Sequence, residues 1–390
     1  MKIVSLTVKN WMNFKELSDV PLHTRNYVIG ANAVGKSNFL DVFRFLRDVA
    51  SPAGAKPAAG GLQEAINRRD GIRKLRCLHG KKDSEVLIDV TVKDGRDRWR
   101  YVLGFKGEGM ANNRVLIRQE AVFKNGQPLP KCQRPDEDDK QDQDRLTATY
   151  LENPNANKEF RGLAHYLSTI TYLHLVPQLL KHADEIGGNR LNRDPFGQGF
   201  LQRVAETKGV TQGARLRRIQ AALSRIVPEF RELSFEQDDI TGAPHLRVNF
   251  KHWRDKGAWQ NEKQFSDGTL RLIGLLWSLM EGDSLLLLEE PELSLNEEIV
   301  SRLPKLIHHV LKSGKYADRQ VIITTHSESL LSDLSIGAES VIRFVSTAGG
   351  TVLKSANEQE AFMLKSGFSV GQALLPAVKP DGAEQLALGI

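Results

Sequence analysis

Residues 30–37 follow the pattern G-x-x-x-x-G-K-[ST], in which Gly30 and Gly35 bracket a short loop that Lys36 and Ser37 close. Loops of this kind turn backbone N–H groups toward phosphates at a helix N-terminus, where the helix dipole favours negative charge. The lysine reaches the terminal phosphates, and the neighbouring hydroxyl joins the coordination shell of Mg²⁺. The spacing therefore predicts a loop that binds a nucleoside triphosphate with Mg²⁺.

Two adjacent carboxylates, Glu289 and Glu290, follow the apolar run 285–288. A buried strand of a parallel sheet delivers the residues at its carboxyl end to the ligand crevice. We expect Glu289 to hold the Mg²⁺ shell through water. We expect Glu290 to polarise the attacking water as a general base.

Two other segments have residue types that suit a phosphate site. His326 ends the strand-like run 321–325, where its ring can donate a hydrogen bond to a γ-phosphate or to the attacking water. A core histidine bonded to the backbone is the alternative. Ser266 is a cap residue and Gly268 permits close backbone approach, so the helix beginning there offers a second anion-binding N-terminus. An ordinary capped helix is the alternative interpretation.

The elements that must position these residues follow the periodicities of a layered α/β protein. After residue 264, helical segments alternate with short apolar strands, which is typical of a parallel α/β sheet. Alternating strands between residues 85 and 123 predict an antiparallel subdomain. The individual strands are expected at 2–8, 26–29, 85–92, 98–105, 113–123, 169–175, 231–236, 245–251, 284–288, 320–324, 341–346 and 350–354, and helices at about 37–49 and 211–227.

Three segments have the composition of loops. Residues 51–61 are small and rich in Pro and Gly, which predicts a flexible surface loop. Residues 131–145 are dense in charge and are expected to be a solvated excursion. A tail containing Pro and Gly is expected from about residue 366.

Composition limits the environment and the partners. The net charge of +6 and the pI near 9.1 permit contact with nucleic acid without requiring it. The two cysteines, Cys77 and Cys132, have no zinc spacing, which fits a reducing cytoplasm. The first residues alternate like a strand rather than a signal peptide, and the apolar runs are shorter than a membrane span. We expect a cytoplasmic protein that does not bind a membrane.

In order and spacing, the motifs resemble those of ABC-type AAA ATPases of the SMC/RecF/OLD-like branch. In that family the loop at 30–37 is Walker A, and Asn32 and Asn38 match its usual form. The pair Glu289-Glu290 matches Walker B, with Glu in the usual Asp position, and His326 matches the switch histidine.

Three weaker motifs extend the resemblance. Residues 265–269 look like the signature motif, with Asp267 and Thr269 departing from the transporter form, and residues 293–296 resemble the D-loop. Gln178 resembles the Q-loop glutamine that touches Mg²⁺ and water. The resemblance implies catalysis by Glu290 and His326, ATP binding by Gly30, Asn32, Gly35, Lys36, Ser37, Asn38, Ser266 and Gly268, and Mg²⁺ binding by Ser37, Gln178 and Glu289.

The resemblance also implies a fold and an assembly. The chain is expected to be one split ABC-ATPase head of the α/β class, with a mixed or parallel P-loop sheet, an antiparallel β subdomain and helical inserts. The core would comprise 1–50, 85–123, 163–182 and 232–365, with inserted lobes at 51–84, 124–162 and 183–231 and a C-terminal tail at 366–390. Two copies would dock head to tail around ATP, so that Ser266 and Gly268 of one copy complete the γ-phosphate site of the other.

Several classes of function are disfavoured. No membrane segment supports transport, no long coiled coil supports a cohesin-like machine, and too few residues follow His326 for an OLD-type nuclease domain. The favoured hypothesis is the ATPase subunit of a two-component bacterial anti-phage defence system, which senses a trigger and controls a separately encoded effector such as a nuclease. The alternative is a RecF-like DNA-repair clamp, whose DNA contacts would come from the basic stretches 68–76 and 215–218. A non-hydrolysing scaffold is a third possibility, which Glu290 and His326 argue against.

Overall fold

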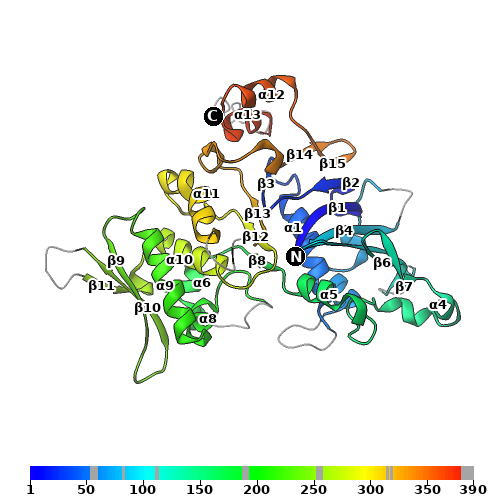
Figure 1. Cartoon of the computed structure of the whole chain (residues 1–390), viewed down its shortest axis with the longest axis horizontal. Coiled ribbons are helices and arrows are strands. Elements are labelled where there is room, and N and C mark those ends of the chain that lie inside the picture. The colour runs from blue at the N-terminus through cyan, green and yellow to red at the C-terminus, as the bar shows by residue number, and fades with distance from the viewer. Residues whose placement is uncertain are drawn as a thin grey trace, which may run out of the picture.

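The computed structural model of the chain describes residues 1–52, 60–80, 84–109, 114–186, 193–251, 258–312, 316 and 319–378. Within these residues the strands form two six-stranded sheets and one three-stranded sheet. The two larger sheets pack around helix α1 (Lys36–Ala50), and the three-stranded sheet lies at the opposite end of the molecule (Figure 1).

The sheet that leads into the phosphate-binding loop has the strand order β15-β14-β3-β13-β12-β8. Its strands are β3 (Arg25–Ile29), β8 (Thr171–Leu173), β12 (Leu286–Glu289), β13 (Val321–Thr324), β14 (Val341–Thr347) and β15 (Gly350–Leu353). All neighbours pair in parallel except β15, which is antiparallel to β14. The loop, the two carboxylates and the histidine therefore follow the carboxyl ends of adjacent strands, where parallel sheets bind ligands. The predicted α/β class with a mixed or parallel sheet is confirmed.

The second six-stranded sheet is antiparallel throughout, with the order β2-β1-β4-β5-β6-β7. Its strands are β1 (Lys2–Trp11), β2 (Phe14–Pro21), β4 (Val86–Asp94), β5 (Asp97–Gly107), β6 (Val115–Lys124) and β7 (Gln127–Arg134). The predicted antiparallel strands are therefore present as β4, β5 and β6. The pairing of β7 with β6 extends this sheet, so residues 127–134 belong to it rather than to an inserted lobe at 124–162.

Helix α1 fills the space between the two large sheets because apolar residues recur on several of its sides. Phe39, Phe43 and Phe45 are fully buried in one continuous core with residues of both sheets. Helix α5 (Arg161–Ser168) packs on α1. This burial fixes the N-terminus of α1, and with it the phosphate-binding loop.

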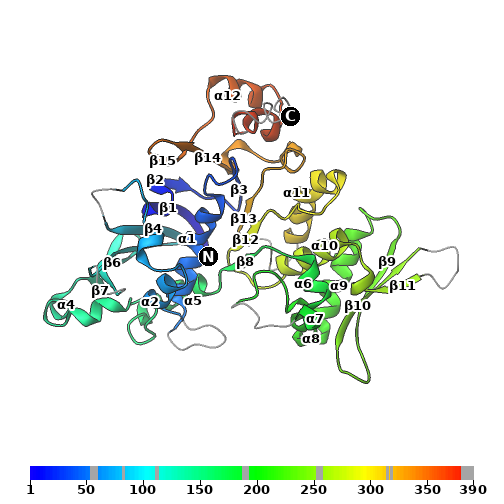
Figure 2. The ribbon, with the colours of Figure 1, turned by 180° about the vertical axis from the view of Figure 1, so that it is seen from behind.

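A second core lies on the other face of the parallel sheet and is built on helices α10 (Asp267–Leu279) and α11 (Glu297–Leu311). In both Figure 1 and Figure 2, β12 and β13 lie between α10 and α1. The three-stranded sheet packs on this side and has the order β11-β10-β9. Its strands are β9 (Phe230–Gln237), β10 (Pro244–Phe250) and β11 (Ala258–Asn261). The helices that precede these strands in the chain are α6 (Pro177–Lys181), α7 (Ala183–Ile186), α8 (Phe200–Glu206) and α9 (Gly209–Leu223).

One of the expected loops contains more structure than its composition indicates, while most of the other, residues 53–59 of the Pro- and Gly-rich stretch, lies outside the described part of the chain. Helices α2 (Leu62–Asn67) and α3 (Ile72–Leu75) follow that stretch. The charged segment 131–145 was expected to be solvated, but it contains the end of β7 and helix α4 (Glu137–Gln141), and Asp139 is buried. Its carboxylate accepts a hydrogen bond from the Asp136 backbone N–H at 2.9 Å, and the Asp136 carboxylate caps α4 in return.

The expected C-terminal tail from residue 366 is partly helical. Helices α12 (Glu358–Lys365) and α13 (Val370–Leu374) pack on each other, and α13 packs on the 3₁₀ turn η5 (Leu330–Ser332). The Arg343 guanidinium on β14 forms a buried two-pronged ion pair with Glu360, at 2.6 and 2.8 Å. The sequence interpretation overlooked the local capping boxes at Asn357 and Ser369. It could not show the ion pair, because that contact joins a strand to a helix that follows it.

In the part of the chain that the structure describes, we find no helix with the length and apolar character needed to span a bilayer.

Candidate functional site

The phosphate-binding loop has the backbone conformation that its glycines allow. Gly35 lies at φ +107°, in the left-handed region that L side chains rarely adopt, and directly precedes α1. A Cβ atom at Gly35 would lie 2.1 Å from the Asn13 Nδ2 atom, so a side chain is excluded sterically as well. The loop therefore needs glycine here for two independent reasons.

A hydrogen-bonded brace holds this loop from outside. The Asn13 side-chain N–H₂ donates to the Val34 carbonyl at 2.5 Å and to the Thr351 hydroxyl at 2.6 Å. The Asn38 side-chain N–H₂ donates to the side-chain amide oxygen of Asn13 at 2.8 Å. The Thr351 hydroxyl also bonds the Val34 carbonyl, at 2.7 Å. Residues from the β1–β2 turn and from β15 thus fix the loop, and Asn38 contributes to its geometry from the first turn of α1.

Lys36 lies inside the curve of the loop. Its ammonium donates to the carbonyl oxygens of Gly30 at 2.9 Å and Ala31 at 3.1 Å. Burial lowers the pKa of Lys36, while the nearby carboxylates of Glu290 and Glu289 act in the opposite direction. The ammonium is therefore held by two neutral carbonyls, which a more strongly attracting phosphate oxygen can replace.

Glu289 lies against the first turn of α1. The Ser37 hydroxyl donates to one of its carboxylate oxygens, and the Tyr172 hydroxyl donates to the other. Hydroxyl and carboxylate oxygens are the ligands that Mg²⁺ prefers, and Mg²⁺ usually takes its remaining ligands from water and substrate phosphates. The adjacent oxygens of Ser37 and Glu289 therefore fit a Mg²⁺ ion bound together with a nucleotide.

Glu290 and His326 form the second pair at this edge. The His326 Nδ1 atom lies 3.1 Å from a Glu290 carboxylate oxygen, and both side chains reach solvent. Glu290 has φ +43°, and its backbone N–H donates to the Thr324 carbonyl at 3.1 Å. Strained backbone of this kind costs of order 1–3 kcal/mol and is concentrated at functional sites. The turn aims the carboxylate out of the strand direction, toward the histidine.

The sequence interpretation missed a third carboxylate behind this pair. Glu292 is buried, and one of its oxygens accepts a hydrogen bond from the Thr325 hydroxyl at 2.6 Å, while the other has no hydrogen-bond partner among the described residues. Burial raises the pKa of Glu292. Because Thr325 precedes His326, this bond fixes the chain at the start of the histidine turn.

The signature-like residues lie apart from this cluster. Ser266 is exposed and caps α10 by accepting a hydrogen bond from the Thr269 N–H at 3.1 Å. Within the described residues, no hydrogen bond joins Ser266 or Gly268 to the loop at 30–37. A Cβ on Gly268 would lie 3.0 Å from the Ser294 carbonyl oxygen, so the D-loop-like segment packs directly on this helix start.

Gln178 is also placed beside α10. Its amide donates to the Asp267 carboxylate at 2.8 Å, and the Lys181 ammonium bonds the same carboxylate at 2.6 Å. In the described part of the chain it forms no hydrogen bond with Ser37 or Glu289, so its role as a Mg²⁺ ligand stays a prediction.

An open groove of about 1060 Å³ extends from Ser37 and Asn38 along α1. Arginines line much of it, and several are paired: the Arg69 guanidinium bonds Asp41 at 2.6 Å and Asp48 at 3.2 Å. The other arginine and lysine side chains along the groove are those of Arg44, Arg47, Arg68, Arg73, Lys74 and Arg76. The predicted basic stretch 68–76 therefore lines a continuous groove beside the phosphate-binding loop.

The second basic stretch lies elsewhere, because Arg215 on α9 stacks on Trp277 of the second core, 4.9 Å from its ring centre. The aromatic residues nearest the loop are also structural. Trp11 and Phe14 are fully buried, and the Trp11 indole N–H donates to the Asn38 carbonyl at 3.1 Å. Neither ring is available to stack on a base.

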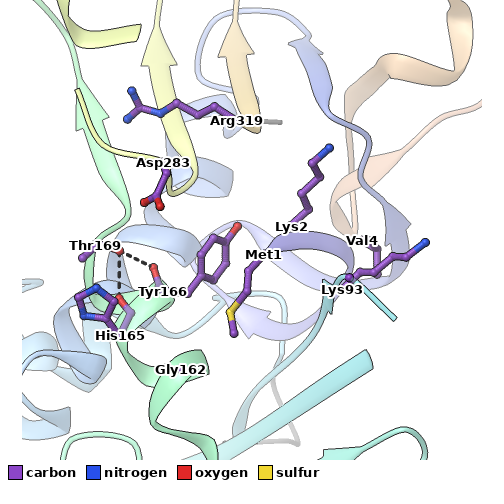
Figure 3. A pocket seen from close by; sticks show the side chains of 11 residues that line it. Met1, Lys2, Val4, Lys93, Gly162, His165, Tyr166, Thr169, Asp283 and Arg319 are labelled. Carbon is purple, nitrogen blue, oxygen red and sulfur yellow. Dashed lines mark hydrogen bonds between the residues drawn. The ribbon is translucent and has the colours of Figure 1, made fainter. Parts of the chain in front are cut away.

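Another cavity, of about 620 Å³, lies at the opposite edge of the parallel sheet (Figure 3). Asp283 and Arg319 line it where the chain enters β12 and β13, with Lys2 and Tyr166 facing them. The hydrogen bonds drawn there join the Thr169 hydroxyl to backbone carbonyls of α5, at 3.0 Å. Because parallel sheets bind ligands at their carboxyl edge, the cluster around Lys36 is the candidate site.

The fold and this cluster define the class: a P-loop AAA domain with the fold of an SMC head. The sequence model of the family described as "AAA domain, putative AbiEii toxin, Type IV TA system" matches residues 25–332, and the chain therefore belongs to that family.

Solved SMC heads are similar in fold. An SMC head bound to the C-terminal winged-helix domain of ScpA has a TM-score of 0.52 and 13% identity, with 93% of this chain and 99% of that chain covered. The SMC head domain from Thermotoga maritima has a TM-score of 0.47 and 15% identity, with 92% and 100% covered. The likeness in fold rests on the first of these. No curated protein sequence matches the chain.

Proposed function

We propose that the chain binds and hydrolyses ATP at the cluster around Lys36. The observation that carries this proposal is the convergence of Lys36, Ser37, Glu289, Glu290 and His326 at one edge of the parallel sheet. The loop N–H groups and Lys36 would hold the phosphates, with Gly30, Asn32, Gly35 and Asn38 shaping the loop. When bound, Mg²⁺ would neutralise charge on the phosphates, and Ser37, Glu289 and Gln178 would hold it.

Glu290 is the general base in this proposal. Its carboxylate reaches solvent beside His326, so it can accept a proton from a water that lies next to this pair. His326 would orient that water and donate to the terminal phosphate. Glu292, through Thr325, keeps the histidine turn in place.

The proposed active form is a head-to-tail dimer. Ser266 and Gly268 begin a 13-residue helix whose N-terminus is exposed and lies apart from the phosphate-binding loop of the same chain. A helix N-terminus attracts phosphate, so this one is available to a nucleotide held by a second copy. Each nucleotide would then bridge the loop of one protomer and the α10 helix of the other.

Mixing two inactive variants tests this arrangement. Lys36→Ala disables the phosphate-binding loop, and Ser266→Arg blocks the N-terminus of α10. Each variant should therefore be inactive as a homodimer. In the mixed dimer one composite site has both defects and the other has none. We therefore expect phosphate release to return on mixing, toward half of the wild-type rate per mixed dimer.

Two controls make the mixing result decisive. Wild type mixed with Lys36→Ala shows how the rate falls when active protomers are diluted by inactive ones. A Lys36→Ala/Ser266→Arg double variant mixed with either single variant should not restore phosphate release. Hydrolysis by Ser266→Arg alone at the wild-type rate would contradict the head-to-tail site.

We further propose that ATP turnover regulates a separately encoded effector, such as a nuclease, in bacterial anti-phage defence. Two observations support a protein partner. The description of the matching family names a putative toxin of a type IV TA system, and an SMC head of similar fold was solved bound to a winged-helix domain of ScpA. Both concern relatives, so the partner of this chain has to be found directly.

Capture from the native host with ATP and Mg²⁺ tests the regulatory role. A Glu290→Gln bait should hold the ATP state, and a Lys36→Ala bait is the matched unloaded control. A stoichiometric second protein present only with Glu290→Gln would support the effector and identify it.

The basic groove along α1 favours the second candidate function, a RecF-like DNA-repair clamp. Phosphate backbones bind such lysine- and arginine-lined surfaces. DNA retained by the Glu290→Gln bait without a second protein would favour the clamp over effector control.

A further inference from the structure

We propose that Tyr172 is a positioning residue for Glu289: its hydroxyl holds one carboxylate oxygen, so that the other oxygen faces the Ser37 hydroxyl and the place that Mg²⁺ would take. The inference rests on the proposed ATPase function and deepens it. The Q-loop, signature and Walker motifs do not include Tyr172. Its hydroxyl on β8 bonds Glu289 on the neighbouring strand β12.

The register of the sheet explains why the two side chains meet. In the parallel pair of β8 and β12, Tyr172 lies beside Leu287. Side chains two residues apart on a strand lie on the same face, so Leu287 and Glu289 both face α1. Tyr172 therefore lies on the same face as Glu289, level with the residue two positions before it. The length of the tyrosine side chain lets its hydroxyl reach the carboxylate.

The tyrosine ring is itself held in place. Tyr172 is 8% exposed and belongs to the core around α1. The Arg44 guanidinium covers its face, 4.3 Å from the ring centre, and lies 3.5 Å from the Asp41 carboxylate on the same helix. A ring packed between a strand and α1 has little freedom, so its hydroxyl is a rigid donor.

The chemistry of Glu289 shows why a rigid donor is useful. Compared with the Asp usual at this Walker B position, Glu has an additional methylene and an additional rotatable bond. A carboxylate on the longer side chain reaches more positions, and bonds to both oxygens restrict it to one. Ser37 bonds one oxygen from the metal side, and Tyr172 bonds the other from the core side.

The test is the Mg²⁺ dependence of nucleotide binding by Tyr172→Phe. The variant keeps the ring and the Arg44 stack and removes only the hydroxyl. Binding of a fluorescent N-methylanthraniloyl-ATP is titrated with Mg²⁺, and again in EDTA. Because partners of metal ligands typically contribute 10–100-fold to metal affinity, we expect the half-maximal Mg²⁺ concentration to rise by roughly that factor. Binding in EDTA should be unchanged.

Tyr101→Phe is the matched control. The Tyr101 hydroxyl also donates to a buried glutamate, Glu120, at 2.9 Å, but in the antiparallel sheet away from the site. It should lower the free energy of unfolding without altering the Mg²⁺ titration.

A double-mutant cycle tests that Tyr172 acts through Glu289. Glu289→Asp shortens the side chain by one methylene and withdraws it from the Tyr172 hydroxyl. Adding Tyr172→Phe to Glu289→Asp should then change the Mg²⁺ dependence no further, a non-additivity expected of directly coupled residues.

Three outcomes would overturn the inference. The first is a Tyr172→Phe titration equal to wild type, the second is an equal shift in Tyr101→Phe, and the third is full additivity with Glu289→Asp. A wild-type protein that binds ATP with no response to Mg²⁺ would overturn both this inference and the proposed Mg²⁺ site. If ATP binding by wild type depends on Mg²⁺ and Tyr172→Phe shows the same dependence, the inference about Tyr172 is rejected and the proposed Mg²⁺ site stands.

Discussion

Replacing Glu290 by Gln is expected to slow ATP hydrolysis by about 10²–10⁴-fold, the usual contribution of a general base. The amide keeps the shape of the side chain and its contact distance to His326, but it cannot accept a proton from water. ATP binding should persist, because Lys36 and the loop at 30–37 are untouched. Phosphate release at saturating ATP measures the rate, and light scattering after size exclusion shows whether ATP now holds a stable dimer.

Glu298→Gln is the control for this substitution, since Glu298 is an exposed carboxylate on α11 that pairs with Arg302, at 2.7 Å. It should hydrolyse ATP at the wild-type rate. A Glu290→Gln protein that retains more than a tenth of the wild-type rate would show that another group accepts the proton.

Replacing Glu360 by Ala should cost about 3–5 kcal/mol of the stability with which the C-terminal helices are held, because it leaves Arg343 buried without its counter-ion. Both partners are almost fully buried, at 2% and 5% exposed, and the pair is two-pronged. The Glu360 carboxylate also accepts the Asn357 N–H at 2.8 Å, so the substitution removes this half of the capping box while the Asn357 side chain still accepts the N–H of residue 360. Hydrogen exchange of α12 and α13, together with urea unfolding, measures the loss.

The pH dependence of this pair has a definite sign. The hydrogen bonds from Arg343 hold the pKa of Glu360 below its usual value. The stabilisation is therefore complete above the unfolded pKa, about 4.3, and is lost as pH falls through the lower folded value. The difference between wild type and Glu360→Ala should accordingly shrink on acidification below about pH 4.

Glu358→Ala is the control, on the exposed first turn of the same helix. A Glu360→Ala protein within about 1 kcal/mol of wild type, with α12 still protected from exchange, would contradict the assigned role of the pair, since surface substitutions usually stay within ±0.5 kcal/mol.

Local patterns explain what could be predicted from the sequence. The loop at 30–37 directly follows a buried strand and the pair Glu289-Glu290 lies at the end of another, so sequence neighbours specify both the chemistry and the position. The alternation of buried strands and helices after residue 264 likewise predicted the parallel sheet, and parallel sheets place such residues at one edge.

What the sequence could not show depends on contacts between distant segments. Tyr172 is 117 positions from Glu289, and Asn13 is 338 positions from Thr351, so no local spacing relates them. The position of Gln178 beside Asp267 has the same cause, because it depends on how α6 packs against α10. The helices after residue 357 were missed since their apolar positions are few and the buried ion pair that holds them involves β14.

The placement of β3 between β13 and β14 has a consequence for synthesis of the chain. Both neighbours of β3 follow it in the chain by about 300 residues. In the antiparallel sheet, by contrast, every strand except the edge strand β7 lies within the first 124 residues. At about 5–20 residues per second, a ribosome adds those 300 residues in roughly 15–60 s. During that time the strand before the phosphate-binding loop has no partner on either side. The antiparallel sheet and α1 can therefore fold while the chain is still being made, but the nucleotide site is completed only after β13 and β14 have been synthesised.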